Sequence, residues 1–142
     1  MTELRKVLDE GVRPGVYRLL STQPADQVRQ TVTTEGWGFV LLDTTAVLDK
    51  AGFLDVCATA FDLPRWFGRN WDALADSLSD RSTGEPEVVL WEGWRELLDH
   101  DRDTVDVALQ IFAEDANESG QLRILLREAA DVPDLVSALP VL

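Results

Sequence analysis

Runs of consecutive apolar residues, each about as long as a β-strand, constrain the fold of this chain more than any other sequence feature. They predict strands near residues 38–42 and 87–91, and two further strands are predicted near 16–20 and 121–126. A continuous apolar run, unlike an alternating one, indicates a strand that is covered on both faces, as in parallel sheets. Segments with helical spacing separate these runs. The alternation predicts an α/β fold with a small, mainly parallel sheet of three to four strands packed by helices.

The length of 142 residues corresponds to one ordinary domain, within which we expect three parts. Residues 1–34 form an N-terminal βα extension, residues 35–128 form the core, and residues 129–142 form a C-terminal tail. Charged residues occupy the N-terminus where a signal peptide needs an apolar segment, and no apolar run approaches the roughly 18 residues of a membrane span. With Cys57 as its single cysteine, the chain is expected to be cytoplasmic, without internal disulfides and without membrane association.

Acidic side chains dominate the composition and are unevenly distributed. The net charge is −13, and residues 85–118 hold eleven acidic side chains against Arg95 and Arg102. Residues 1–34, in contrast, carry five basic and four acidic side chains. A strongly negative surface repels nucleic acid and suits a basic protein partner, although acidity that only maintains solubility remains a second interpretation. Any electrostatic function is therefore expected within residues 35–118.

Histidine and cysteine, which are common in metal sites and in nucleophilic catalysis, occur once each, as His100 and Cys57. Cys57 lies on an apolar helical face, which is typical of a core position, and His100 stands between two aspartates, as expected for a surface residue. We therefore expect no metal, no cofactor and no catalytic residue. An enzyme that uses Asp72 and Asp76 with a divalent metal remains an alternative, which metal-dependent turnover would reveal.

One stretch near the middle of the chain combines a helical pattern with two carboxylates. Its apolar side, at spacings of three and four residues, consists of Trp71, Leu74, Ala75 and Leu78. Asn70 is placed to cap the helix, and Asp72 then lies in the first turn, where the helix dipole favours an acidic side chain. Asp72 and Asp76 are four residues apart, so both project from the other side of the helix. We expect Trp71 in the core and Arg69 within reach of Asp72. A solvated acidic face is the alternative to a functional pair.

The loop before this helix contains two adjacent aromatic residues, Trp66 and Phe67, followed by Gly68. Large aromatic side chains bring much contact area with few rotatable bonds, which makes them common at binding hot spots. Aromatic residues that only cover the sheet are the alternative. We favour that alternative for Phe67, whereas both interpretations stay open for Trp66. The loop therefore predicts a binding surface beside the first carboxylate.

Residues 63–78 resemble the signature loop and helix of the barstar family, intracellular inhibitors of secreted microbial ribonucleases of the barnase type. The pattern is L-P-x-W-F-G-x-N-x-D-A-L-x-D-x-L, which is long enough to make a chance match a poor explanation. The resemblance extends over about residues 38–127, and it implies a non-enzymatic inhibitor with a small parallel sheet packed by helices. Residues 1–34 are absent from the short form of the family, and we expect them to extend the sheet at one edge.

The resemblance also implies which side chains bind the ribonuclease. The implied contact residues are Trp66, Gly68, Asn70, Asp72, Ala75, Asp76 and Glu114. In the family, the loop and the acidic helix fill the active-site cleft, so Asp76 takes the place of an RNA phosphate among basic side chains. Asp72 pairs with basic groups at the cleft edge, Trp66 occupies the position of a contacting aromatic, and Glu114 matches a peripheral acidic contact. The expected complex contains one ribonuclease and one inhibitor, which is monomeric when free.

Ala75 departs from the family pattern, because the best-known inhibitor has a tryptophan at this position. One aromatic contact is therefore missing, and partner choice can differ. A second hypothesis keeps the fold and changes the target: an immunity or regulatory protein that binds a different basic toxin or partner. A pull-down with basic proteins would separate the two hypotheses.

Overall fold

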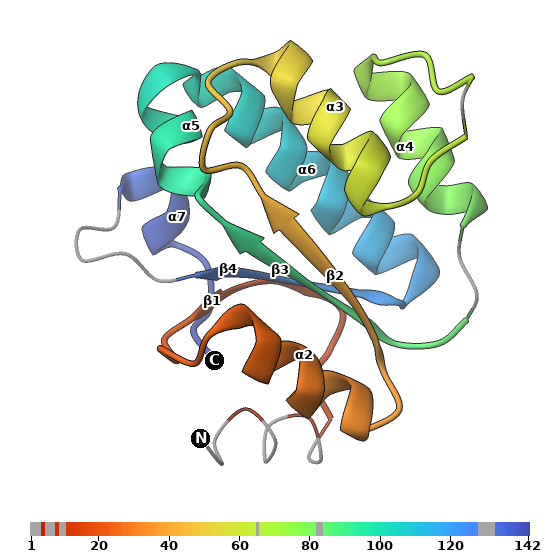
Figure 1. The fold of residues 1–142 in the computed structure, drawn as a ribbon, viewed down its shortest axis with the longest axis vertical. Helices are drawn as coiled ribbons and strands as arrows, with labels where there is room; N and C mark the ends of the chain where they lie inside the picture. The colour runs from red at the N-terminus through yellow and green to blue at the C-terminus, as the bar shows by residue number, and fades with distance from the viewer. Residues whose placement is uncertain (1–3, 5–7, 9–10, 65, 82–83, 128–132) are drawn as a thin grey trace.

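Four parallel strands form one sheet in the computed structural model, which describes residues 4, 8, 11–64, 66–81, 84–127 and 133–142. The strands are β1 (Gly15–Leu19), β2 (Gly38–Asp43), β3 (Glu87–Glu92) and β4 (Leu122–Arg127), in the spatial order β1-β4-β3-β2 (Figure 1). Every strand lies within about a residue of its predicted bounds. The predicted α/β fold with a parallel sheet is therefore confirmed.

Helices cover both faces of this sheet. One face carries α3 (Lys50–Ala60), α4 (Trp71–Asp80), α5 (Trp94–His100) and α6 (Arg102–Ser119), and the other carries α2 (Ala25–Thr34), as Figure 1 shows. The short α7 (Asp134–Ser137) lies in the tail. None of the helices in the described ranges combines the length and the apolar character that a bilayer crossing needs.

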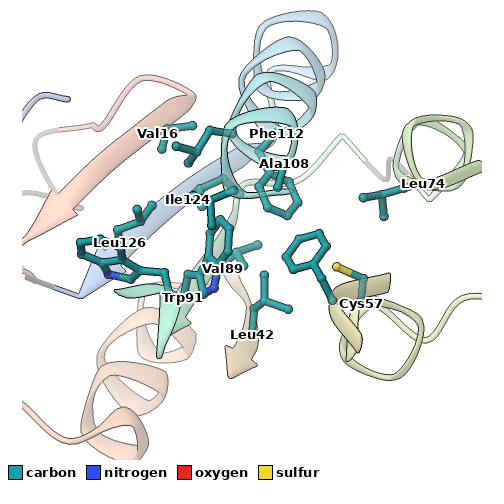
Figure 2. Packing of buried hydrophobic residues seen from close by; sticks show 14 of the residues in the cluster. Val16, Leu42, Cys57, Leu74, Val89, Trp91, Ala108, Phe112, Ile124 and Leu126 are labelled. Atoms are coloured by element: carbon teal, nitrogen blue, oxygen red, sulfur yellow. The ribbon is translucent and has the colours of Figure 1, made fainter. Parts of the chain in front are cut away.

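Successive apolar residues of a strand are buried on opposite faces of the sheet. In β3, Val89 and Trp91 belong to the larger core cluster, under the four helices, while Val88 and Leu90 belong to a second cluster under α2. Figure 2 shows the larger cluster, where Trp91 lies in edge contact with Phe112 of α6 at 5.8 Å between ring centroids. Since successive side chains of a strand point to opposite faces, burial on both sides requires an uninterrupted apolar run.

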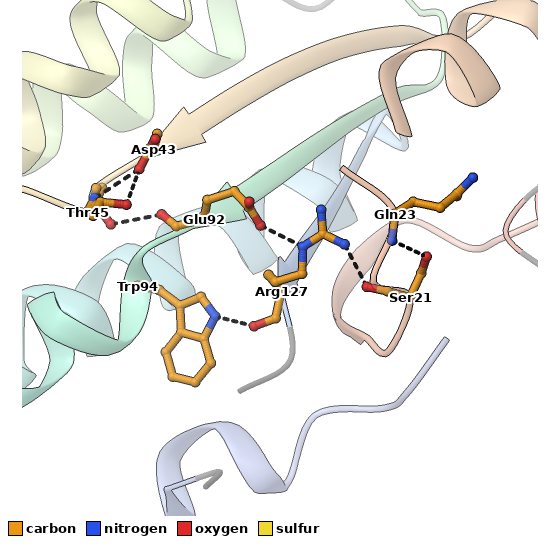
Figure 3. Close-up of polar contacts among 8 residues, drawn as sticks. Ser21, Gln23, Asp43, Thr45, Glu92, Trp94 and Arg127 are labelled. Atoms are coloured by element: carbon orange, nitrogen blue, oxygen red, sulfur yellow. Dashed lines mark hydrogen bonds and ion pairs between the residues drawn. The ribbon is translucent and has the colours of Figure 1, made fainter. Parts of the chain in front are cut away.

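The N-terminal βα extension occupies the edge of the sheet and the face opposite α4. β1 pairs with β4, and α2 buries Val28 and Val32 in the second cluster. Arg127 ties the extension to the sheet, because its Nη1 donates to the Ser21 carbonyl oxygen over 2.6 Å and its Nε lies 2.7 Å from Glu92 Oε1 (Figure 3). The predicted extension at one sheet edge is therefore present.

The C-terminal tail covers the outer edge of β1. The Arg18 N–H donates to the Pro140 carbonyl oxygen over 2.8 Å, and the Leu142 N–H donates to the Arg18 carbonyl oxygen over 2.9 Å. An uncovered strand edge offers its free amide and carbonyl groups to other chains. The last residues of the tail therefore protect the edge that the extension adds.

Asp115 on α6 is a carboxylate that the fold buries, with 8% of its surface exposed. Burial, and then the charge of Glu118, raise the pKa of Asp115 above its ordinary value, although Arg81 and a hydrogen bond from Ser119 act in the opposite direction. The folded protein therefore holds this proton more tightly than the unfolded chain does. The resulting stabilisation is complete below the ordinary aspartate pKa and is lost as the pH rises through the raised pKa.

We expect Asp115→Asn to stabilise the protein at neutral pH. The free energy of unfolding at pH 7 should rise by more than the roughly 0.5 kcal/mol that bounds most surface substitutions. The gain should shrink toward about pH 3.5, where the aspartate is protonated even in the unfolded chain. Urea unfolding at both pH values measures this, with Glu114→Gln, an exposed neighbour on the same helix, as the control. Unchanged or lower stability of Asp115→Asn at pH 7 would contradict the prediction.

Candidate functional site

The loop between α3 and α4 buries one aromatic side chain and presents the other to solvent. Phe67 is 5% exposed and joins the larger core cluster, whereas Trp66 is 84% exposed. The Phe67 N–H donates to the Pro64 carbonyl oxygen, and the Leu63 N–H donates to the Ala58 carbonyl oxygen, both over 2.9 Å. These bonds hold the loop against α3, so Trp66 projects from a fixed backbone. The buried position that we favoured for Phe67 is confirmed.

Arg69 ends this loop in the left-handed backbone region, with φ 49°, which residues other than glycine rarely adopt. Its Nε lies 2.7 Å from Asp55 Oδ1 on α3, and its Nη1 donates to the Phe67 carbonyl oxygen over 3.3 Å. The predicted contact between Arg69 and Asp72 is therefore wrong, because the side chain turns back toward α3. Asp55 thus neutralises a positive charge that lies next to the acidic helix α4.

Asn70 caps α4, as the sequence predicts. Its Oδ1 accepts a hydrogen bond from the Ala73 N–H over 2.7 Å, which satisfies one of the free amides at the helix start. A β-carbon added at Gly68 would lie 3.3 Å from Asn70 Nδ2, closer than most such contacts. The glycine therefore leaves room for the capping side chain, and the start of α4 has a defined geometry.

α4 is anchored on its inner side by Leu74 and Leu78, which are both buried. Trp71 packs against the larger core cluster but is only half-buried, so the predicted core position is confirmed in part. Its ring packs 5.9 Å from the Phe53 ring, and Lys50 Nζ lies over it at 5.4 Å from the centroid. The first residue of a helix lies at the rim of the packed layer, where part of a large ring stays in contact with water. The two buried leucines, together with the contact between Trp71 and Phe53, therefore fix the rotation of α4.

Three aspartates, Asp72, Asp76 and Asp80, follow one another at four-residue spacing along the exposed side of α4. Their carboxylates form no hydrogen bond or ion pair with any residue that the structure describes. Residues at this spacing lie one above the other, and like charges there disfavour the helix by a few tenths of a kcal/mol. We did not predict Asp80 as a site residue, although its spacing from Asp76 is a visible signal. A cationic partner bound to this row of carboxylates would reduce the repulsion between them.

The other two predicted site residues lie on α4 and on the neighbouring helix α6. Ala75 is half-buried on α4, and Glu114 is exposed on α6, the helix that packs next to α4 (Figure 1). The Glu114 carboxylate also has no partner among the residues that the structure describes. The fold thus brings the loop and α4 together directly, whereas Glu114 belongs to the neighbouring helix.

A pocket of about 280 Å³ lies where the α3–α4 loop meets the end of α4. It is lined by Phe61, Asp62, Leu63, Pro64, Trp66, Ser77, Asp80 and Arg81. The Arg81 guanidinium is already paired, because its Nη1 and Nη2 donate to the two Glu87 carboxylate oxygens over 2.6 and 3.0 Å. The pocket therefore combines an exposed aromatic side chain with the Asp62 and Asp80 carboxylates, which pair with no cation in the described part of the chain.

Comparison with known protein families finds a match to the model described as Barstar (barnase inhibitor) over residues 37–130. This region spans most of the chain, from the start of β2 to the end of β4. The chain belongs to the Barstar family. The resemblance of residues 63–78 to that family is thereby confirmed, and β1 and α2 lie outside the matched region. Comparison with curated proteins gave no significant match.

The Barstar family is described by inhibition of an enzyme and not by an enzymatic reaction. In the described part of the chain, no group of three or more His, Cys, Asp and Glu side chains could hold a metal ion. Cys57 is buried in the core, and burial raises the pKa of its thiol far above the ordinary value, so the thiol is an inert core group. His100 is exposed on α5, where its Nδ1 lies 2.9 Å from the Glu96 carbonyl oxygen.

Proposed function

We propose that this Barstar-family protein inhibits a secreted microbial ribonuclease of the barnase or guanyl-specific type. In the proposed complex, the α3–α4 loop and the acidic side of α4 fill the active-site cleft of the enzyme. The observation that carries the proposal is a capped helix whose exposed carboxylates have no partner among the described residues, next to a Trp66 that is 84% exposed. A row of carboxylates without partners among the described residues, next to an exposed aromatic side chain, is chemically suited to a cleft that binds RNA.

The contact residues have different roles in this proposal. Asp76 is the central carboxylate and takes the place of an RNA phosphate, and Asp72 pairs with basic groups at the cleft edge. Trp66, Gly68 and Asn70 form the loop surface. Glu114 is a peripheral acidic contact, and the half-buried Ala75 lacks the aromatic contact that the best-known inhibitor makes at this position.

In the proposed inhibition, carboxylates imitate RNA phosphates, and the rigid helix α4 holds them in place. A ribonuclease cleft presents Arg, Lys and His side chains to hold a polyanion, and a carboxylate can occupy such a site without being cleaved. The Asn70 cap and the buried Leu74 and Leu78 hold Asp72 and Asp76 in place before binding, which keeps the ordering cost low. The net charge of −13 also attracts a basic enzyme over long range, and this attraction weakens as salt is added.

We also propose where the protein acts and how many ribonuclease molecules it binds. The protein acts in the cytoplasm of the producing cell as a monomer, and it binds one ribonuclease molecule. The second candidate function is immunity against a different basic toxin, which the missing aromatic contact at Ala75 favours. The same acidic surface would serve in both cases, and only the target would differ.

Titration of purified barnase-type and guanyl-specific ribonucleases with this protein tests the proposal. We expect complete inhibition at one molar equivalent, with an association rate that falls several-fold between low and moderate salt. Asp26→Asn, which changes an exposed carboxylate on α2, should inhibit as the wild type does. If the folded protein inhibits none of several such ribonucleases, the ribonuclease is the wrong target and a different basic toxin becomes the working hypothesis.

A further inference from the structure

The pocket between the α3–α4 loop and the end of α4 continues the acidic row of that helix. Asp80 lines the pocket and stands four residues after Asp76 on the same exposed side. Trp66, which the family resemblance assigns to partner contact, lines the pocket from the loop. The pocket therefore adjoins the proposed ribonuclease-binding surface and opens to the same side of the molecule.

The size of the pocket fits a side chain better than a whole ligand. Its volume of about 280 Å³ lies just below the range of roughly 300–1,000 Å³ that is typical of small-molecule sites. Its lining residues Phe61, Leu63 and Pro64 are apolar, and Asp62 and Asp80 bring negative charge. Glu87 already neutralises Arg81, the cation that the structure describes in the pocket. Among the lining residues that the structure describes, the charge without a partner is therefore negative.

We propose that this pocket is a subsite for one arginine or lysine side chain of the protein partner, held between the Trp66 ring and the Asp80 carboxylate. An indole ring attracts a cation over its face, and arginine also stacks on aromatic rings. Asp80 supplies a charge-assisted hydrogen bond to the same cation. The proposal rests on the proposed function, and it adds a specificity-determining contact at the edge of the inhibitory surface.

The first test measures ribonuclease inhibition with a double-mutant cycle. Asp80→Asn and Trp66→Ala should each weaken inhibition about tenfold, and the double variant should lose much less than the product of the two, because both remove the same bound cation. Asp26→Asn carries the same charge change on the opposite face of the sheet and is the matched control. An Asp80→Asn variant that behaves like Asp26→Asn, or two losses that simply multiply, would overturn the subsite.

The second test needs no ribonuclease. N-acetyl-arginine amide is titrated into the isotope-labelled protein, with N-acetyl-citrulline amide as the uncharged isostere, and the Trp66 indole N–H and Asp80 amide signals are followed by NMR. We expect saturable shifts with the arginine compound alone, and their loss in Asp80→Asn. Equal shifts with both compounds, or shifts that survive Asp80→Asn, would show that the pocket does not select a cation.

The two tests separate failure of the subsite from failure of the proposed function. Arginine binding by a protein that inhibits no ribonuclease would retain the subsite and assign it to another basic partner. Strong inhibition with no selective effect of Asp80→Asn in either test would retain the inhibitor and reject the subsite.

Discussion

Replacing Asp76 by alanine is expected to weaken ribonuclease inhibition by about 30- to 4,000-fold, because basic groups of the enzyme cleft would be buried without a counter-charge. Truncating one partner of a buried, hydrogen-bonded charge pair costs about 2–5 kcal/mol, and every 1.4 kcal/mol is a tenfold change in affinity. In the free protein, Asp76 is exposed and has no partner among the described residues. The effect should therefore appear in affinity and not in folding stability.

The inhibition constant of Asp76→Ala, measured beside its thermal unfolding, tests this expectation. Asp26→Ala is the matched control, since it removes an exposed aspartate from the helix on the opposite face of the sheet. Its inhibition should stay close to that of the wild type. Equal inhibition by the two variants would show that Asp76 is not the central carboxylate, even if the protein is an inhibitor.

Deletion of residues 1–36 is expected to remove most of the stability of the protein. The deletion would expose Val88, Leu90 and Leu125, which are at most 1% exposed in the intact fold, and it would uncover the edge of β4. Full burial of an aliphatic side chain contributes about 1.5–3 kcal/mol, so these three together contribute about 5–9 kcal/mol. A typical domain has only about 5–15 kcal/mol in total. We therefore expect an aggregating or largely unfolded product.

Circular dichroism and urea unfolding of the shortened protein measure this loss. A paired substitution on α2 separates packing from chain length: Val32→Asp places a charge in the second cluster, while Thr33→Asp places it on the exposed side of the same helix. Only Val32→Asp should destabilise strongly. A shortened protein with wild-type stability would mean that the outer face of the sheet needs no cover.

The strands were predictable because the signal for a covered strand is local. Apolar stretches with helical segments between them were enough to place β1, β2, β3 and β4, and burial on both faces explains why the runs in β2 and β3 are continuous. The cap at Asn70 and the outward side of α4 were predictable for the same reason, since both depend on residues within two helical turns. Periodicity reports which side of an element is buried, whatever element covers it.

The features that were missed depend on packing between distant segments. α5 spans only Trp94–His100, too short for a periodic signal, and it forms where Trp94, Leu97 and Leu98 can be buried. Asp101 caps α6, because its Oδ1 accepts a hydrogen bond from the Thr104 N–H over 3.2 Å. This cap directly follows the end of α5, so the place where α6 begins depends on how α5 packs.

The candidate site also combines features that the sequence predicts with features that depend on tertiary packing. The sequence by itself determined the α/β order, the family and the row of carboxylates on one side of α4, because spacing along the chain sets them. Only the tertiary structure decided that Trp66 is exposed beside the buried Phe67, that Arg69 pairs with Asp55, and that a pocket forms beside Asp80. Adjacent residues of one type carry the same local signal. The contacts that distinguish them come from elements that only folding brings together.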